Sequence, residues 1–310
     1  EQDQLVSANG RCAVDRDVLQ RQVEDLPGGR VAQRREQHDR QVPEQQQEGQ
    51  RRHGPGLQEQ PDADRKGGQG IMKTIGLLGG MSWHSTGLYY RLLNEGVQQR
   101  LGGLHSAKIL LASVDFAEIA ELQADNAWEQ AGQALAKQAH KLQQAGADFL
   151  IIGTNTMHIS VPQIEQAIDI PILHIADATA DAILDAGFNT AGLLGTQFTM
   201  QMDYYKQRLI DRGLEVLVPG DAACRRINDV IFDKLCYGEI RDASKQDYLN
   251  FIQQLVDKGA GCIIEGCTEI TLLVNQSDTG VRLFDTTALH AQAAWRSGDI
   301  ATAQAATAAA

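Results

Sequence analysis

Short apolar runs alternate with amphipathic helical patterns from residue 72 to about residue 295. The apolar runs predict strands buried on both faces, as in a parallel sheet. The expected strands cover residues 74–78, 109–114, 149–152, 172–174, 190–194, 215–218, 262–265 and 283–284. The expected helices cover residues 83–101, 128–144, 161–167, 176–186, 200–212, 225–235 and 245–258.

This alternation indicates an α/β fold built from right-handed βαβ units. The chain also reads as two related halves, because Gly-Thr-Asn-Thr follows a strand at residues 153–156 and Gly-Cys-Thr-Glu follows one at residues 266–269. We therefore predict two pseudo-symmetric small α/β domains, each with a mainly parallel sheet flanked by helices, and an active site in the cleft between them. The first domain is expected to comprise residues 72–172 and 281–296, and the second residues 173–280.

The two ends of the chain differ from this core. Residues 1–71 are rich in Gln, Arg, Asp, Glu and Gly and show no sustained apolar period, so we expect a disordered extension. Met72 begins the ordered pattern like a start codon, which suggests that the extension is not native. Residues 297–310 form an Ala-rich tail that has no apolar stripe with which to dock.

Composition and charge narrow the possible partners. The 310-residue chain has 43% hydrophobic and 22% charged residues, which are globular values, and a net charge of -12. An acidic protein is a poor candidate for binding nucleic acid or an anionic membrane. The cysteine count of five is odd and no C-x-x-C pair occurs, so neither a disulfide framework nor a zinc knuckle is expected. These features favour a reducing, cytoplasmic location.

The polar motifs follow predicted strands, where open α/β sheets bind ligands. The first motif is Gly79-Gly80-Met81-Ser82-Trp83, which suits either a tight turn or an anion-binding loop. Ser82 is also a plausible N-cap for the helix that follows. The second motif, Thr154-Asn155-Thr156-Met157-His158, either caps a helix or supplies donors to a substrate carboxylate and ammonium. For His158, a structural role and acid/base work remain equally open.

The third motif is Gly266-Cys267-Thr268-Glu269. A cysteine between a strand and a helix N-terminus can have its thiolate stabilised by the helix dipole. The alternative is an inert buried thiol, which is the usual fate of a free cysteine and the one expected for Cys262. Cys224 and Cys236 lie in or beside a predicted helix and are interpreted as packing residues.

Five motifs in this order resemble the aspartate/glutamate racemase family: GGMSW, NTMH, LLGT at residues 193–196, GCTE, and FDTT at residues 284–287. The resemblance covers about residues 72–294. It implies two α/β domains with the site between them, a homodimer, and catalysis without pyridoxal phosphate, another cofactor or a metal. It also implies two opposed cysteines, of which one removes the α-proton and the other supplies a proton to the opposite face.

The chain departs from this pattern at one position, because Thr154 stands where the family places its first cysteine. Cys267 matches the second cysteine. A threonine hydroxyl is a far weaker acid than a thiol and serves poorly as a base, although it can pass on a proton or hold a water. With Thr154 and Cys267 as the catalytic pair, we expect strongly unequal rates for the two enantiomers.

The resemblance also assigns substrate-binding residues. The α-carboxylate and ammonium are expected to contact polar groups in the four strand-end loops: Met81, Ser82, Asn155, Thr156, Thr196, Thr268 and Glu269. Gln123 and Arg226 are candidates for the distal carboxylate of aspartate or glutamate. Two alternatives stay open: a related cysteine-dependent enzyme, such as a hydantoin racemase, maleate isomerase or decarboxylase, and an amino-acid-binding protein that has lost catalysis.

Overall fold

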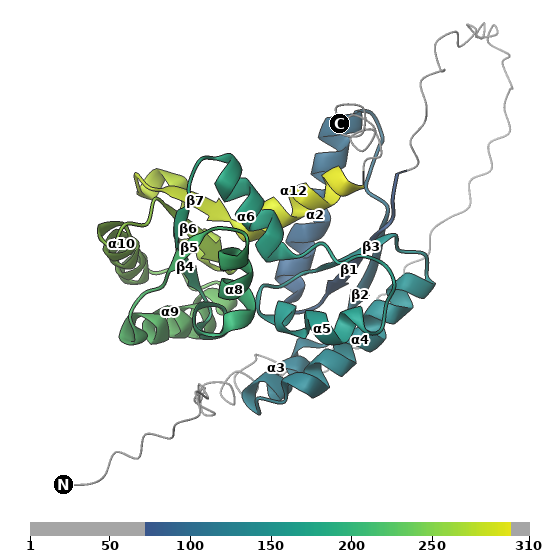
Figure 1. The fold of residues 1–310 in the computed structure, drawn as a ribbon, viewed down its shortest axis with the longest axis horizontal. Helices are drawn as coiled ribbons and strands as arrows, with labels where there is room; N and C mark the ends of the chain where they lie inside the picture. The colour runs from purple at the N-terminus through teal and green to yellow at the C-terminus, as the bar shows by residue number, and fades with distance from the viewer. Residues whose placement is uncertain (1–71, 299–310) are drawn as a thin grey trace, which may run out of the picture. The chain divides into compact units, whose positions relative to one another are not determined.

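The structure is a computed structural model that describes residues 72–298. The predictions for residues 1–71 and for all but the first two residues of the Ala-rich tail lie outside the described residues. The described part contains two parallel β-sheets with helices packed against them (Figure 1). This confirms the predicted α/β class with two small sheets.

The first sheet has three parallel strands in the order β2-β1-β3. They are β1 (Ile75–Gly79), β2 (Ile109–Ser113) and β3 (Phe149–Ile152). Strand β1 is central and every residue in it is buried, so its polar neighbours begin only where the strand ends. The parallel register brings the carboxyl ends of β1 and β3 to the same edge of the sheet.

Both faces of this sheet are covered by helices (Figure 1). Leu78 and Ile152 pack in a core with α4 (Trp128–Gln144) and α5 (Val161–Glu165). Alternate strand residues point the other way and pack with α2 (Trp83–Leu101) and α12 (Thr286–Ser297). Burial on both faces explains why the strands read as continuous apolar runs instead of alternating ones.

The second sheet has four parallel strands in the order β5-β4-β6-β7. They are β4 (Thr190–Gly195), β5 (Glu215–Leu217), β6 (Cys262–Gly266) and β7 (Arg282–Asp285). One core of buried residues unites this sheet with its principal helices, which are α6 (Ile175–Asp185), α8 (Asp203–Asp211), α9 (Asp221–Asp233) and α10 (Asp242–Asp257). Adjacent β4 and β6 place their ends side by side.

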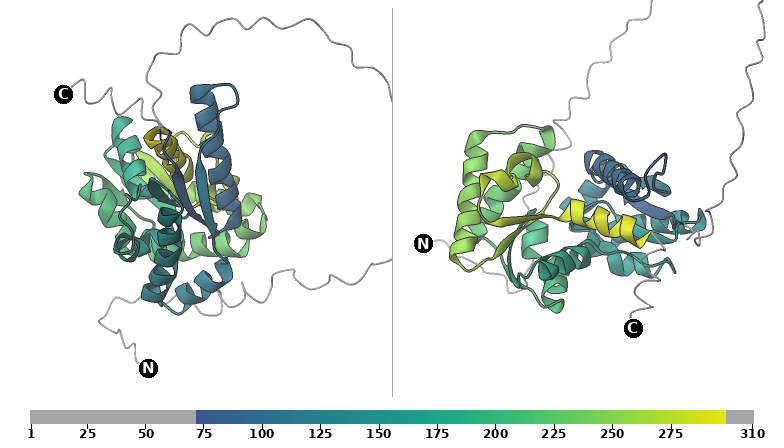
Figure 2. Two further views of the ribbon diagram at one scale, coloured as in Figure 1. Left: turned by 90° about the vertical axis from the view of Figure 1, so that its right-hand side faces the viewer. Right: turned by 90° about the horizontal axis from the view of Figure 1, so that it is seen from above.

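Residues 281–296, which the sequence assigned to the first domain, are divided between the two sheets. Strand β7 pairs with β6 and so belongs to the second sheet, which corrects the assignment of this strand. Helix α12 instead lies beside α2 (Figure 2). A Cβ on Gly96 of α2 would come 2.3 Å from the Trp295 indole of α12, so only glycine permits this close approach.

Several local features differ from the predictions, and α12 was not predicted as a helix. The helix expected over residues 200–212 is interrupted at Met202, whose backbone is extended, which gives α7 (Gln197–Gln201) and α8. The strand expected at residues 172–174 is a single parallel bridge between Ile172 and Leu150, and His174 caps α6. Helix α3 (Phe116–Ala124), capped by Asp115, was not predicted, because nine residues with two buried positions carry a weak periodic signal.

Candidate active site

A pocket lies where β1, β3, β4 and β6 end, so residues next to both sheets line it. The predicted site residues that line this pocket are Met81, Ser82, Gln123, Thr154, Asn155, Thr156, Thr196, Cys267, Thr268 and Glu269. They are far apart in sequence. All but Gln123, which lies on α3, follow the carboxyl ends of these strands, which meet at the pocket.

The loop after β1 forms one corner of the pocket. Gly80 has φ +95°, and a Cβ there would come 2.2 Å from the Val114 carbonyl oxygen, so the turn requires glycine. The turn places Met81 and Ser82 at the pocket, and the Ser82 hydroxyl accepts a hydrogen bond from the Ser85 N–H at 3.4 Å. This confirms Ser82 as the N-cap of α2. The Ser85 hydroxyl lies 2.7 Å from the Thr268 hydroxyl and joins this loop to the one after β6.

Residues 266–269, which follow β6, form what we call the Cys267 wall. The Cys267 thiol donates to Glu269 Oε2 at 2.9 Å, and the Thr268 hydroxyl donates to the same oxygen at 2.8 Å. Helix α11 (Ile270–Leu273), which begins just beyond, has only four residues. The carboxylate of Glu269 is therefore the group that acts directly on the thiol.

The surroundings of Cys267 favour its protonated form. Burial raises the pKa of the thiol well above its usual value, and the negative charge of Glu269 raises it further. We expected from the sequence a thiolate stabilised by a helix N-terminus, and that expectation is wrong for this geometry. The structure instead pairs a thiol with a carboxylate that can receive its proton.

Residues 153–156, which follow β3, form what we call the Thr154 wall. Thr154 is half-buried in the pocket lining, and its carbonyl oxygen lies 2.7 Å from His158 Nδ1. The Asn155 amide donates to the Thr286 hydroxyl at 3.1 Å, and that hydroxyl donates to the Glu265 carbonyl at 2.9 Å. This chain of hydrogen bonds ties the Thr154 wall to β6.

Several polar groups of the pocket remain available to a ligand. Asn155 Oδ1 is buried and has no hydrogen-bond partner among the described residues, which is costly unless a donor arrives. The Thr156 and Thr196 hydroxyls lie 3.2 Å apart at the ends of β3 and β4. A free amide oxygen and paired hydroxyls suit a ligand that carries both an ammonium and a carboxylate.

The pocket lining is poor in positive charge. Among the described residues that line it, none is lysine, arginine or histidine, and Glu269 is an acidic member. Within residues 72–298, no group of three or more His, Cys, Asp or Glu side chains is placed to hold a metal ion. Neutral donors therefore dominate the binding surface that the structure describes.

The two candidates for the distal carboxylate are in different places. Gln123 of α3 is buried and lines the pocket, where its amide lies 2.9 Å from Met157 Sδ. Arg226 of α9 is not among the lining residues, and its guanidinium pairs with Asp247 at 2.8 Å. The structure thus brings Gln123 to the site and gives Arg226 a partner elsewhere.

Sequence reasoning missed part of the lining. The additional residues are Ser85, Phe116, Ile231, Phe232, Cys236, Gly266 and Thr287. Cys236 was interpreted as a packing residue, yet it is exposed on the short helix η2 (Leu235–Tyr237) and borders the pocket. No strand end precedes η2, so the signal that revealed the other loops was missing there. Thr287 is the last residue of the FDTT motif, so the sequence did contain a signal for it.

Comparison with known proteins identifies the family of the chain. Residues 78–294 match the Asp/Glu/hydantoin racemase family. The broad specificity amino-acid racemase RacX of Bacillus subtilis is 24% identical over 69% of this chain and 93% of that protein. None of the described helices is both long and apolar enough for a membrane crossing.

Two crystal structures extend the comparison. A protein of Yersinia pestis, assigned as an Asp/Glu racemase, is 49% identical with a TM-score of 0.71, covering 73% of this chain and 99% of that one. An aspartate racemase homologue from Pyrococcus horikoshii is 30% identical with a TM-score of 0.64, again covering 73% and 99%. The family match spans most of the chain and includes both walls of the pocket, so this protein belongs to the Asp/Glu/hydantoin racemase family, whose amino-acid racemases work without pyridoxal phosphate.

Proposed function

We propose that the protein is a cofactor-independent racemase for aspartate, glutamate or both, and that Cys267 and Thr154 serve opposite faces of the substrate α-carbon. The observation that carries the proposal is that these two side chains line one pocket, at the carboxyl ends of β6 and β3. Membership of the family supports the reaction class.

At the Cys267 face, Glu269 is the proposed acceptor of the thiol proton. The Sγ–H bond points at Glu269 Oε2, so transfer of that proton leaves a thiolate beside a protonated carboxyl. The thiolate then removes the α-proton, and the electron pair stays on the α-carbon, delocalised into the substrate carboxylate. Return of a proton from sulfur or from the opposite face restores the amino acid.

Substrate orientation follows from the polar groups left open. Asn155 Oδ1 is the proposed acceptor for the substrate ammonium. The hydroxyls of Thr156 and Thr196 are proposed donors to the α-carboxylate, with Thr268, Ser82 and Met81 completing the wall around it. A carboxylate held by hydroxyl donors stabilises the negative charge that develops when the α-proton leaves.

Thr154 gives the reaction its proposed asymmetry. A racemisation equilibrium constant is 1, so kcat/KM for inversion must be the same from either enantiomer. The inequality expected from the sequence therefore concerns α-hydrogen exchange. The enantiomer whose α-hydrogen faces Cys267 exchanges readily with solvent, whereas its mirror image depends on the weaker hydroxyl or on a water that Thr154 holds.

The test is α-hydrogen exchange in D₂O, followed by NMR, with each pure enantiomer of aspartate and of glutamate. We expect one enantiomer to exchange at least about 10-fold faster than it inverts, and the other to exchange no faster than it inverts. Equal exchange rates would sink the proposed asymmetry. A protein that binds these amino acids without any exchange would be the binding-protein alternative, which the retained bond between Cys267 and Glu269 disfavours.

A second candidate function is racemisation of amino acids with uncharged side chains. The described lining lacks lysine and arginine, so the distal carboxylate of glutamate would depend on neutral donors such as Gln123. The relative RacX, which is a broad specificity amino-acid racemase, supports this second candidate. The ratio of kcat/KM for glutamate to that for glutamine separates the two candidate functions. Under the first proposal, kcat/KM for glutamate should be at least about 10-fold higher.

The proposed assembly is a homodimer, as the family resemblance implies, and the proposed location is the cytoplasm, as the cysteine content favours. Analytical ultracentrifugation of the full chain at micromolar concentration tests the assembly. A sedimenting species of about twice the monomer mass is expected, and a monomer at all concentrations would contradict it.

Aspartate and glutamate differ by one methylene, which binding discriminates by only about 1–3 kcal/mol, so activity toward both is expected.

A further inference from the structure

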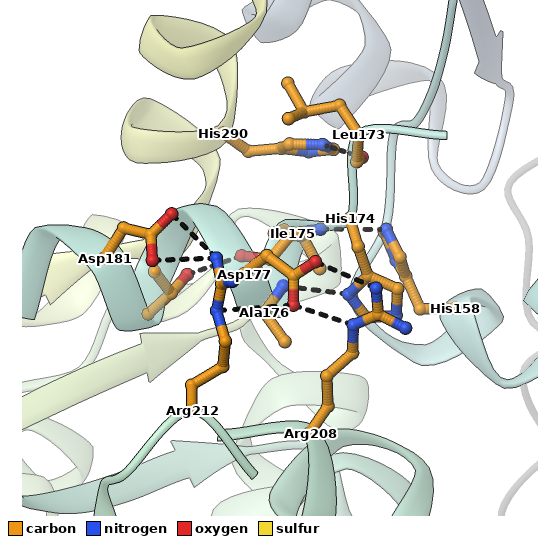
Figure 3. Close-up of polar contacts among 11 residues, drawn as sticks. His158, Leu173, His174, Ile175, Ala176, Asp177, Asp181, Arg208, Arg212 and His290 are labelled. Atoms are coloured by element: carbon orange, nitrogen blue, oxygen red, sulfur yellow. Dashed lines mark hydrogen bonds and ion pairs between the residues drawn. The ribbon is translucent and has the colours of Figure 1, made fainter. Parts of the chain in front are cut away.

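His158, His174 and His290 are buried and lie close together (Figure 3). His158 contacts the main chain of the Thr154 wall. The ring centroid of His158 lies 4.5 Å from that of His174 and 5.7 Å from that of His290. None of the three lines the pocket, so they do not touch a substrate bound there.

The hydrogen bonds of His158 assign its proton. Nε2 faces the backbone N–H of Ile175 at 3.2 Å, which can only donate, so this nitrogen is an acceptor. The proton of a neutral ring must then sit on Nδ1, which lies 2.7 Å from the Thr154 carbonyl oxygen and donates to it. His158 thus spans from the first turn of α6 to the main chain of the Thr154 wall.

The proton of the neutral His290 ring is located in the same way. Its Nε2 lies 2.7 Å from the Leu173 carbonyl oxygen, which can only accept, so Nε2 carries the proton. Its Nδ1 is then the acceptor for the Tyr89 hydroxyl at 2.8 Å. His174 accepts the Ala176 N–H through Nδ1, as the cap of α6.

The groups that face His158 favour its neutral form. Burial lowers its pKa well below the usual value, and His174, His290 and Arg208 act in the same direction. Arg208 is held in place by Asp177, through hydrogen bonds of 2.7 and 2.8 Å (Figure 3). A neutral ring with one donor and one acceptor is what the two backbone contacts of His158 need, since an imidazolium would present a second proton to the Ile175 N–H.

We propose that His158 is a positioning residue for proton transfer at the Thr154 face, and that it acts by fixing the carbonyl of Thr154 against α6. This inference rests on the proposed function. The carbonyl that His158 holds belongs to Thr154 itself, so this contact sets the position of the Thr154 hydroxyl, whereas the Asn155 amide is held separately by the Thr286 hydroxyl. A misplacement of about 1 Å at a reacting group can lower a rate by about 10²-fold.

Two variants of His158 separate its two hydrogen bonds. His158→Asn keeps an amide nitrogen near the place of Nδ1, so a donor to Thr154 remains while the contact with Ile175 is lost. His158→Gln reaches toward the place of Nε2 and loses the donor to Thr154. His174→Asn is the matched control, because it removes a neighbouring ring and leaves the contact with Thr154, and asparagine is a good helix cap.

The readout is the ratio of inversion to α-hydrogen exchange, measured in D₂O with the enantiomer whose hydrogen faces Cys267. Exchange with retention needs Cys267 alone, whereas inversion also needs the Thr154 face. We expect His158→Gln to lower kcat for inversion by about 10²-fold while exchange with retention and KM change less than about 3-fold. His174→Asn should stay within about 5-fold of the unaltered protein in both rates, whereas His158→Asn, which keeps the donor to Thr154 but loses its contact with α6, should lower inversion less than His158→Gln does.

An equal loss of inversion and exchange in His158→Gln would overturn the proposal, because that pattern means a general structural defect. Unchanged inversion would overturn it as well. ¹⁵N NMR of the imidazoles in the unaltered protein is an independent check that does not depend on turnover or on variants that fold: the Nδ1–H form of His158 is expected from pH 8 to pH 5.5, and the Nε2–H form or a protonated ring would refute the assignment. Absence of any exchange in the unaltered protein would instead refute the proposed function, whatever form the ring takes.

Discussion

The two walls of the pocket are alike in backbone and unlike in chemistry. Each follows a buried parallel strand, β3 or β6, and each presents a Gly-x-x-x loop of polar residues to the same pocket. In the Cys267 wall, the thiol donates a hydrogen bond to the Glu269 carboxylate. In the Thr154 wall, the side chain carries a hydroxyl, and the backbone carbonyl of Thr154 accepts a hydrogen bond from His158. The pseudo-symmetry of the strands therefore places the two groups without making them equivalent.

The buried groups behind the walls also differ. Neutral histidines lie behind the Thr154 wall, and burial lowers the pKa of His174 to about 2 and that of His290 to about 4. Behind the Cys267 wall lies Glu265, whose pKa burial raises to about 8, with the neighbouring Asp285 adding to the shift. Each wall thus rests on groups that the protein interior keeps uncharged near neutral pH.

The largest expected effect comes from removing the stronger acid/base group. Cys267→Ser should lower both inversion and α-hydrogen exchange by about 10²–10⁴-fold, because a hydroxyl cannot replace the thiol as a base. The matched control is Cys262→Ser, which changes a buried thiol at the start of β6, the strand that Cys267 follows, and this thiol does not line the pocket. Its kcat should stay close to that of the unaltered protein, and comparable losses in both variants would remove the distinction between the two cysteines.

The comparison of the walls is tested most directly by making them alike. Thr154→Cys should speed α-hydrogen exchange at the slow face by at least about 10-fold and bring the exchange rates of the two enantiomers closer together, because a thiol is a far stronger acid than a hydroxyl. Exchange is measured in D₂O with each pure enantiomer. If the ratio of exchange rates stays where it was, the asymmetry has a source other than Thr154.

Variants of Gln123 and Arg226, the two candidates for binding the distal carboxylate, should have smaller effects, which are seen in KM. Gln123→Leu should raise KM for glutamate by about 10-fold, as expected for the loss of one hydrogen bond to a charged group, with kcat little changed. Arg226→Gln should leave KM within about 2-fold and cost at most about 1 kcal/mol of unfolding free energy, because its partner Asp247 forms an exposed pair with it. The reverse pattern in KM would return the role to Arg226.

Glu265→Gln should have the smallest effect on activity. It tests instead how the free energy of unfolding depends on pH. The folded protein keeps a proton on Glu265 up to about pH 8, whereas an unfolded chain releases it near pH 4.5, so the stabilisation is present below pH 4.5 and lost as pH rises through 8. Glutamine cannot ionise. Between pH 5 and pH 8.5, the unaltered protein should therefore lose at least about 1.4 kcal/mol relative to the variant, as measured by urea unfolding.

The histidines behind the Thr154 wall change the stability of the fold with pH in the opposite direction to Glu265. Their folded pKa values lie below the usual 6.5, so the stability that they contribute is present above pH 6.5 and falls as the pH drops toward 4. In the same urea titrations, acidification from pH 7 to pH 5 should therefore destabilise both the unaltered protein and Glu265→Gln. A stability that rises on acidification in the variant would contradict the neutral state of the rings.

Much of the fold was predictable because its signals are local. Continuous apolar runs followed by glycine or small polar residues located β1, β3, β4 and β6, and nine of the eleven suggested site residues follow these runs and line one pocket. Arg226 does not line the pocket, and a basic residue in a helix gives no sign of which way it points. Helix α3 was missed, but its buried residue Gln123 had been suggested for the site.

The sequence by itself determined the strand ends, the order of the motifs and the replacement of a thiol by Thr154, because each of these depends on residues that are neighbours in the chain. Only the tertiary structure decided the state of the groups in those positions. The raised pKa of the Cys267 thiol, the proton position on His158 and the neutral Glu265 all depend on burial and on partners from distant segments. Desolvation and hydrogen bonds across the fold are invisible in a linear pattern, and here they set the chemistry of the two walls.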